Sequence, residues 1–347
     1  MYRAAPVDFP SPMNRKRSFW LLALIPIIGL IWAMKSAASW RPQLIGTQAN
    51  AECPWMSFDG HLMVVETINN VNGSQIWDVE TGQPLWRSRG SSDYSLAMSP
   101  DNHILVLAHA AHPLDVPLQL LVGVQLELHD QRTGHLIRRL EKCDFTPEDQ
   151  LLTCSFSAKS DEVILATKFF VRRWSVATGK LLVAHKWTPV KNQQLGLVTT
   201  DYDPDKEQVV AYEIGGPISI FDAHTGRQLR HLAPCLASTD PVGLDNFLWI
   251  SPDGYSFYEQ SEGQPTSRVF RLSDGKLLWR ATNWPTFTDD GKLAYLPTNS
   301  GLDVFDAHTG RRLNHIPGPK EYGFAISPDG NWIYETRADK IYRWRAR

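Results

Sequence analysis

Two turn sequences alternate along most of the chain, and their regular return restricts the fold more than any other feature. The first turn is of the Ser-Pro-Asp-Gly type and recurs seven times, at a mean interval of about 45 residues. The second turn ends in Thr-Gly or Asp-Gly and follows within the same interval. The first turn occupies 57–60, 99–102, 157–160, 203–206, 251–254, 288–291 and 327–330, and the second occupies 77–82, 129–134, 174–179, 221–226, 270–275 and 305–310.

Each repeat is predicted to form four short antiparallel strands, which we call A to D. Asp, Pro and Gly clusters between β-rich segments such as 103–110 and 161–169 mark tight hairpins. Thr-Gly supplies the left-handed residue that closes the second hairpin. One such sheet cannot bury both of its faces, whereas a ring of sheets can. Four strands in a period of 40–45 residues therefore predict an all-β, seven-bladed β-propeller.

A large ring side chain lies five residues before each second-turn glycine. We expect these side chains to lie on strand C and to pack between neighbouring blades. They are Trp77, His129, Trp174, Phe221, Phe270 and Phe305, and Trp344 holds the same place in a seventh copy.

The repeat resembles those of WD40-like and quinoprotein-like β-propellers over roughly residues 41–347. The segment IWDVETGQPLWR, 76–87, is similar to the WD repeat and also to the quinoprotein repeat, which ends Thr-Gly-x-x-x-Trp. Two features depart from these families. The Gly-His pair that precedes strand A in WD40 repeats is missing, and tryptophan after the turn glycine occurs only as Trp86 and Trp279. The resemblance implies either an interaction scaffold or a ligand-binding ring.

The seventh repeat lacks an outer strand, because the chain stops after strand C at KIYRWRAR. The segment 41–48 is the only spare candidate, and an unpaired edge would favour aggregation. We therefore expect 41–48 to supply strand D of the last blade, so that the propeller domain covers 41–347. This strand would start at the face that carries the tight turns.

The amino-terminal segment predicts a membrane anchor. Ser18–Ala38 is an apolar run of 21 residues with Lys35 as its only charge, long enough for a helix that crosses a bilayer. Three basic residues precede it, so 1–17 is predicted to be a cytoplasmic tail and the propeller to be extracytoplasmic, periplasmic or extracellular. The alternative is a cleaved signal peptide with Ser36 and Ala38 before the cut. With an anchor, we expect the turn face to lie toward the membrane.

An identical heptamer, FDAHTGR, occurs at 221–227 and again at 305–311. It could mark a duplicated chemical site that contains His224 and His308. The repeat assigns both copies to C–D turns two blades apart, which is too far for one shared metal ion. We therefore interpret the heptamer as part of the architecture.

Charge and motifs exclude several classes of function. Residues 41–347 hold 30 basic and 36 acidic residues without a basic run, so nucleic acid is not an expected partner. No G-x-S-x-G, H-E-x-x-H, phosphate loop or zinc-type cysteine spacing occurs, and no enzyme activity, cofactor or metal is predicted. His109 and His112 are a weak metal candidate. Cys143 and Cys154 could form a disulfide in an oxidising compartment, or both could be buried thiols.

The connections opposite the tight turns vary most in length, and variable loops on a rigid ring are usual sites of binding. Trp187, Trp284 and Tyr322 lie in or beside them and are predicted to be aromatic anchors for a partner, or alternatively to pack against neighbouring loops. The sequence thus predicts a membrane-tethered, monomeric, non-enzymatic propeller that acts as a protein-interaction scaffold. The alternative is a ligand-binding or enzymatic propeller of the quinoprotein or lactonase type, whose site residues converge on the central channel, often around calcium.

Overall fold

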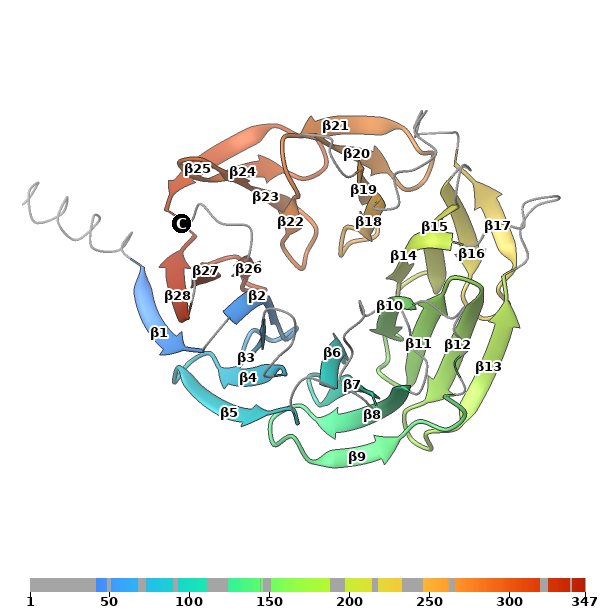
Figure 1. The fold of residues 1–347 in the computed structure, drawn as a ribbon. Helices are drawn as coiled ribbons and strands as arrows, with labels where there is room; N and C mark the ends of the chain where they lie inside the picture. Colours follow the sequence, from blue (N-terminus) through green and yellow to red (C-terminus); the bar gives the residue numbers. More distant parts are fainter. Residues whose placement is uncertain are drawn as a thin grey trace, which may run out of the picture. The chain divides into compact units, whose positions relative to one another are not determined.

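The computed structural model describes a propeller within the unit Gln43–Arg347. Seven separate four-stranded antiparallel sheets are arranged around a common centre (Figure 1). The prediction of an all-β, seven-bladed propeller is confirmed. The described residues are 42–48, 51–67, 73–89, 93–110, 124–143, 145, 151–187, 197–213, 218–232, 246–261, 266–318, 324–337 and 339–346.

Within each blade the four strands lie side by side in the order A, B, C and D from the centre of the ring to its rim (Figure 1). Strand A is therefore innermost and strand D outermost. Blades 1 to 3 consist of β2 (Ala51–Met56), β3 (Leu62–Thr67), β4 (Gln75–Asp78) and β5 (Gln83–Arg87); β6 (Asp93–Met98), β7 (Ile104–Ala110), β8 (Val124–Asp130) and β9 (Leu136–Arg139); and β10 (Leu151–Phe156), β11 (Glu162–Thr167), β12 (Phe170–Ser175) and β13 (Leu181–Lys186). Blades 4 and 5 consist of β14 (Leu197–Asp203), β15 (Gln208–Glu213), β16 (Ile218–Asp222) and β17 (Gln228–His231); and β18 (Asn246–Ile250), β19 (Ser256–Ser261), β20 (Ser267–Arg271) and β21 (Leu277–Ala281). Blades 6 and 7 consist of β22 (Thr286–Phe287), β23 (Leu293–Thr298), β24 (Gly301–Asp306) and β25 (Arg312–Pro317); and β26 (Phe324–Ile326), β27 (Trp332–Arg337), β28 (Lys340–Arg345) and β1 (Gln43–Thr47).

The first tight turn of each blade is closed by a serine or threonine and an aspartate in most copies. In blade 5, Ser251 Oγ donates to the Asp253 carboxylate (2.6 Å) and accepts from the Ser256 N–H (2.9 Å). The same carboxylate accepts from the Tyr255 N–H (3.0 Å). The turn therefore satisfies its own backbone donors, which is why this sequence recurs in most of the turns between strands A and B.

In blades 1, 2, 4 and 6 the second tight turn is closed by an aspartate four residues before the glycine, as the FDAHTGR heptamer of blade 4 shows. The Asp222 carboxylate accepts from the N–H (2.8 Å) and the hydroxyl (2.9 Å) of Thr225. The Gly226 N–H donates to the Asp222 carbonyl (2.9 Å), and Gly226 has a φ of 64°, which favours glycine. Asp306 and Thr309 repeat this geometry in blade 6. Both heptamers therefore close C–D hairpins, as predicted.

The ring side chains of strand C pack between neighbouring blades. Trp174 of blade 3 is fully buried against Val106, Leu126 and Leu128 of blade 2. Trp77 of blade 1 packs against blade 7 in the same manner. The hydrophobic core is thus divided into wedges between blades, and each blade buries both faces only because it has neighbours on both sides.

The two ends of the described chain meet in the last blade. β1 pairs antiparallel with β28, as predicted for the segment 41–48. Gln48, just after β1, accepts from the Trp77 indole N–H (2.9 Å) and donates to the Val65 carbonyl (3.0 Å) of blade 1. The outer strand is therefore fixed to the blade on its other side as well.

The predicted membrane span, 18–38, and the tail before it lie outside the described residues. Among the residues that are described, no helix has the length and apolar character needed to cross a membrane.

Candidate functional site

Four aromatic side chains form a continuous cluster at the inner wall of blades 5 and 6. Trp249 on β18 stacks with Tyr258 on β19, with ring centroids 5.0 Å apart, and Trp284 lies 5.7 Å from Trp249. Phe287 on β22 extends the cluster, 5.9 Å from Tyr258. Because β18 and β22 are innermost strands, this cluster lies next to the centre of the ring (Figure 1).

Trp284 is the exposed member of the cluster. It precedes β22 by two residues, and 40 % of its surface is exposed, whereas Tyr258, on the other side of Trp249 in the cluster, is 6 % exposed. Strand A of blade 6 has only two residues, so Trp284 occupies a position just before its start. The indole thus packs against Trp249 and is still partly exposed, two features of an aromatic anchor.

Asp201 of blade 4 lies beside this cluster and links two inner strands. Its carboxylate accepts from the Ile250 N–H of β18 (2.7 Å) and from the Tyr202 N–H (2.8 Å). Burial raises the pKa of Asp201 from 3.8 to about 6, partly opposed by these two hydrogen bonds, and Asp203 raises it further. Burial, with a smaller contribution from Asp201, also raises the pKa of Tyr258.

These interactions give Asp201 a structural role in the first instance. Both carboxylate oxygens are engaged by backbone N–H groups, so the side chain bridges blades 4 and 5. Within the described residues, no group of three or more His, Cys, Asp and Glu side chains is arranged to hold a metal ion. The described residues here offer a cluster of aromatic rings beside the Asp201 carboxylate.

The three predicted anchors differ in their surroundings. Trp187 is 5 % exposed, its indole N–H donates to the Thr167 carbonyl (2.9 Å), and its ring contacts Phe221. Of the two alternatives, anchor or packing residue, the surroundings of Trp187 match the second, because its side chain presents almost no surface to a partner. Trp284 combines exposure with aromatic support. Tyr322 lies outside the described residues.

Cys143 and Cys154, the two cysteines considered for a disulfide, are free thiols in the structure, and a disulfide between them in an oxidising compartment stays a prediction. Cys154 lies in β10 and, like Cys143, packs against the apolar wedge between blades 2 and 3. Burial raises the pKa of Cys154 to about 12. The Cys143 thiol donates to the Leu140 carbonyl (3.4 Å). Both thiols are partly buried in the structure.

The two histidines of the repeated heptamer have different partners. His224 pairs with Glu207 of its own blade. His308 pairs with Asp253 of blade 5 (2.7 Å), and its ring lies 4.0 Å from that of Tyr255. Each histidine therefore makes a local contact between turns, consistent with a role in the architecture.

Sequence reasoning missed Trp249, Tyr258 and Asp201. Trp249 and Asp201 both stand two residues before a first turn, at equivalent positions of adjacent inner strands. Aligning the strands A by their turns would have revealed two unusual residues side by side.

Comparison of the sequence with models of protein families finds no match, and comparison with curated protein sequences finds none either. The resemblance to WD40-like and quinoprotein-like repeats therefore stays a prediction. The structure supports the coarser statement that the chain contains a seven-bladed β-propeller.

Proposed function

We propose that the protein is a membrane-tethered, non-enzymatic propeller that binds an extracytoplasmic protein partner through Trp284 and the surface around it. The supported, exposed indole of Trp284 is the observation that carries this proposal. Exposed tryptophans backed by other aromatic rings are typical centres of protein interfaces, because they bury a large area with little loss of side-chain entropy. The rigid ring keeps the position of this side chain fixed.

The tether follows from the apolar run at 18–38 and the basic residues before it. An anchor would hold the propeller close to one membrane, where a partner could be captured by repeated encounters. The ring would then serve as a platform, a use of the propeller that the fold by itself does not determine.

The test is a pull-down of the full chain from gently solubilised membranes, with the bound proteins identified by mass spectrometry. Trp284→Ala is expected to lose a protein partner that the wild type retains. Trp284→Phe is expected to recover part of the binding, since it restores an aromatic face. Phe58→Ala is the matched control, because Phe58 is an exposed aromatic residue (52 %) on a turn of blade 1.

Two outcomes would refute the proposal. One is equal capture of all partners by Trp284→Ala and Phe58→Ala when both variants melt at the temperature of the wild type. The other is a stoichiometric small molecule or metal ion in the purified chain without a protein partner, which would favour the ligand-binding alternative.

A further inference from the structure

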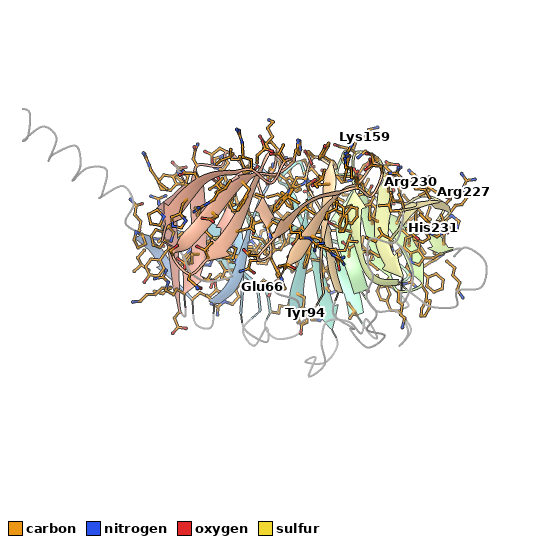
Figure 2. All side chains as sticks on the ribbon, turned by 90° about the horizontal axis from the view of Figure 1, so that it is seen from above. Glu66, Tyr94, Lys159, Arg227, Arg230 and His231 are labelled. Atoms are coloured by element: carbon orange, nitrogen blue, oxygen red, sulfur yellow. The ribbon has the colours of Figure 1, made fainter. Side chains whose placement is uncertain are left out.

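The outer wall of the ring carries one sign of charge. Between each second-turn glycine and the end of the following strand D, the chain has eleven Lys or Arg residues and no Asp or Glu. Figure 2 shows two of these residues, Arg227 and Arg230, together with His231 at the outer rim. The stretches are 83–87, 135–139, 180–186, 227–231, 276–281 and 311–317.

The face that carries the tight turns has the opposite charge. The seven first turns, from the Ser, Thr or Asp to the residue before strand B, and the six second turns together contain sixteen acidic and five basic residues. Lys159, one of the five, lies on this face in Figure 2, while Glu66 and Tyr94 lie toward the other. The segregation is thus between the rim and the turn face, although the charge of the whole chain is close to zero.

The outer wall also exposes aliphatic side chains at regular intervals. Each of the seven outer strands has a leucine or isoleucine that is 38–55 % exposed. Exposed edge strands often carry charges that prevent pairing with other chains. Acidic side chains would prevent such pairing as well as basic ones, and exposed leucines would not prevent it. Protection of the edge strands therefore does not by itself explain why the outer wall is basic and carries exposed aliphatic side chains. Basic residues interspersed with exposed aliphatic ones are typical of surfaces that lie on anionic lipid.

The connection to the predicted span selects one part of this wall. The span ends at residue 38 and β1 begins at Gln43, so the five intervening Cα–Cα steps reach at most about 18 Å. With the proposed tether, the linker would keep the start of β1 within that reach of the membrane surface. The acidic turn face would be repelled by anionic headgroups, whereas the wall beside β1 would be attracted.

We propose that the outer wall of blades 6, 7 and 1 lies on the anionic headgroups of the tethering membrane, an inference that rests on the proposed tether. Leu313, Leu44 and Leu85, exposed by 46 %, 55 % and 38 %, insert among the headgroups of the outer leaflet. Arg311, Arg345 and Arg87, which are all exposed, contact the phosphates. The ring then stands on its rim, and the turn face is held away from the bilayer rather than against it.

The test places a photo-crosslinking amino acid at single positions of the full chain, reconstituted in vesicles. Positions 85 and 313 probe the proposed contact, and positions 182 and 229 are matched controls on the opposite side of the ring (Figure 1), 52 % and 40 % exposed. The vesicles contain phosphatidylcholine alone or equal parts of phosphatidylcholine and phosphatidylglycerol. We expect lipid crosslinks at 85 and 313 to rise severalfold with the anionic lipid and to fall in high salt, while 182 and 229 stay low.

Charge reversal separates attraction from simple proximity. Arg87→Glu with Arg311→Glu is expected to reduce crosslinking at 313 to the level in phosphatidylcholine alone. Lys180→Glu with Arg227→Glu makes the same change of charge on the far side and is expected to leave it unchanged. Equal crosslinking at near and far positions, no response to anionic lipid, or crosslinks to an acidic protein instead of lipid would overturn the inference.

Alkaline extraction of the same vesicles distinguishes the two proposals. A chain that is released from the membrane contradicts the tether itself. A chain that is retained, but shows no preference for crosslinking at 85 and 313, contradicts the rim contact alone.

Discussion

Closure of the ring depends on Gln48, and Gln48→Ala is expected to destabilise the protein by about 2–4 kcal/mol. Gln48 is 3 % exposed and makes two side-chain hydrogen bonds to blade 1, with Trp77 and Val65. Alanine leaves the indole N–H and the carbonyl buried without these partners, and each such loss costs about 1–3 kcal/mol. The two losses sum to about 2–6 kcal/mol. We expect the lower part of this range, because the Val65 carbonyl can still accept a hydrogen bond from another donor.

Gln43→Ala is the matched control, since Gln43 lies at the other end of β1 and accepts from Arg343 (2.8 Å) in an exposed position. Its loss is expected to cost about 0–1 kcal/mol, because water replaces an exposed hydrogen bond. Urea unfolding of the full chain in detergent measures both changes, and hydrogen exchange shows where the protection is lost.

In Gln48→Ala, the amides of β1 and β28 are expected to lose protection before those of the other blades. If the two variants unfold within about 0.5 kcal/mol of each other, the buried hydrogen bonds of Gln48 do not hold the ring closed and the reasoning is wrong. Loss of protection spread evenly over all blades would also contradict it.

Three further changes have defined outcomes. Gly82→Ala is expected to lower the unfolding midpoint in urea more than Gly226→Ala. Both glycines have a positive φ, but a Cβ added at Gly82 would lie 2.7 Å from the Ile45 carbonyl oxygen, whereas one added at Gly226 would lie no closer than 3.1 Å to any neighbour. Equal losses would contradict this. The pKa of Asp201 is raised from 3.8 to about 6, so its contribution to the free energy of unfolding falls by about 3 kcal/mol in total as the pH rises from well below 4 to well above 6. Asp201→Asn should flatten this part of the pH dependence relative to the wild type. An unchanged slope in urea titrations would contradict it. Cys154 should resist iodoacetamide at pH 8 in the native protein and react after unfolding, which peptide mapping would show; rapid native labelling would contradict the burial.

Much of the fold was predictable because it is fixed locally. The Ser251–Asp253 and Asp222–Thr225 interactions each lie within a few residues of the chain, so their sequences identify the hairpins directly. The position of β1 was predictable for a different reason, since a seventh blade with three strands needs a partner for its open edge.

The candidate site was less predictable because it is assembled across blades. Trp249 contacts Trp284 of the next blade, and Asp201 bonds the backbone of Ile250 in the next blade. These contacts depend on how far each inner strand is offset from its neighbour, which the repeat spacing does not determine. Trp187 shows why two alternatives stayed open in the sequence. A tryptophan beside a long connection can be an anchor or a packing residue, and its burial depends on Phe221 in another blade.

The contact between each outer strand and the next blade explains how such a repeat can keep its geometry while its sequence diverges. An added Cβ at Gly134 would lie 2.5 Å from Trp86, and one at Gly310 would lie 2.4 Å from Trp279, so the tryptophan of the preceding strand D covers the turn glycine. At Gly179 the side chain of Arg138 takes this place. The contact between blades thus requires a glycine in the turn and close approach of strand D from the preceding blade, whereas the type of side chain that covers the glycine can differ. Tryptophan after Thr-Gly can therefore be lost from most blades without opening the ring, and a sequence pattern that depends on this tryptophan recognises only part of the fold.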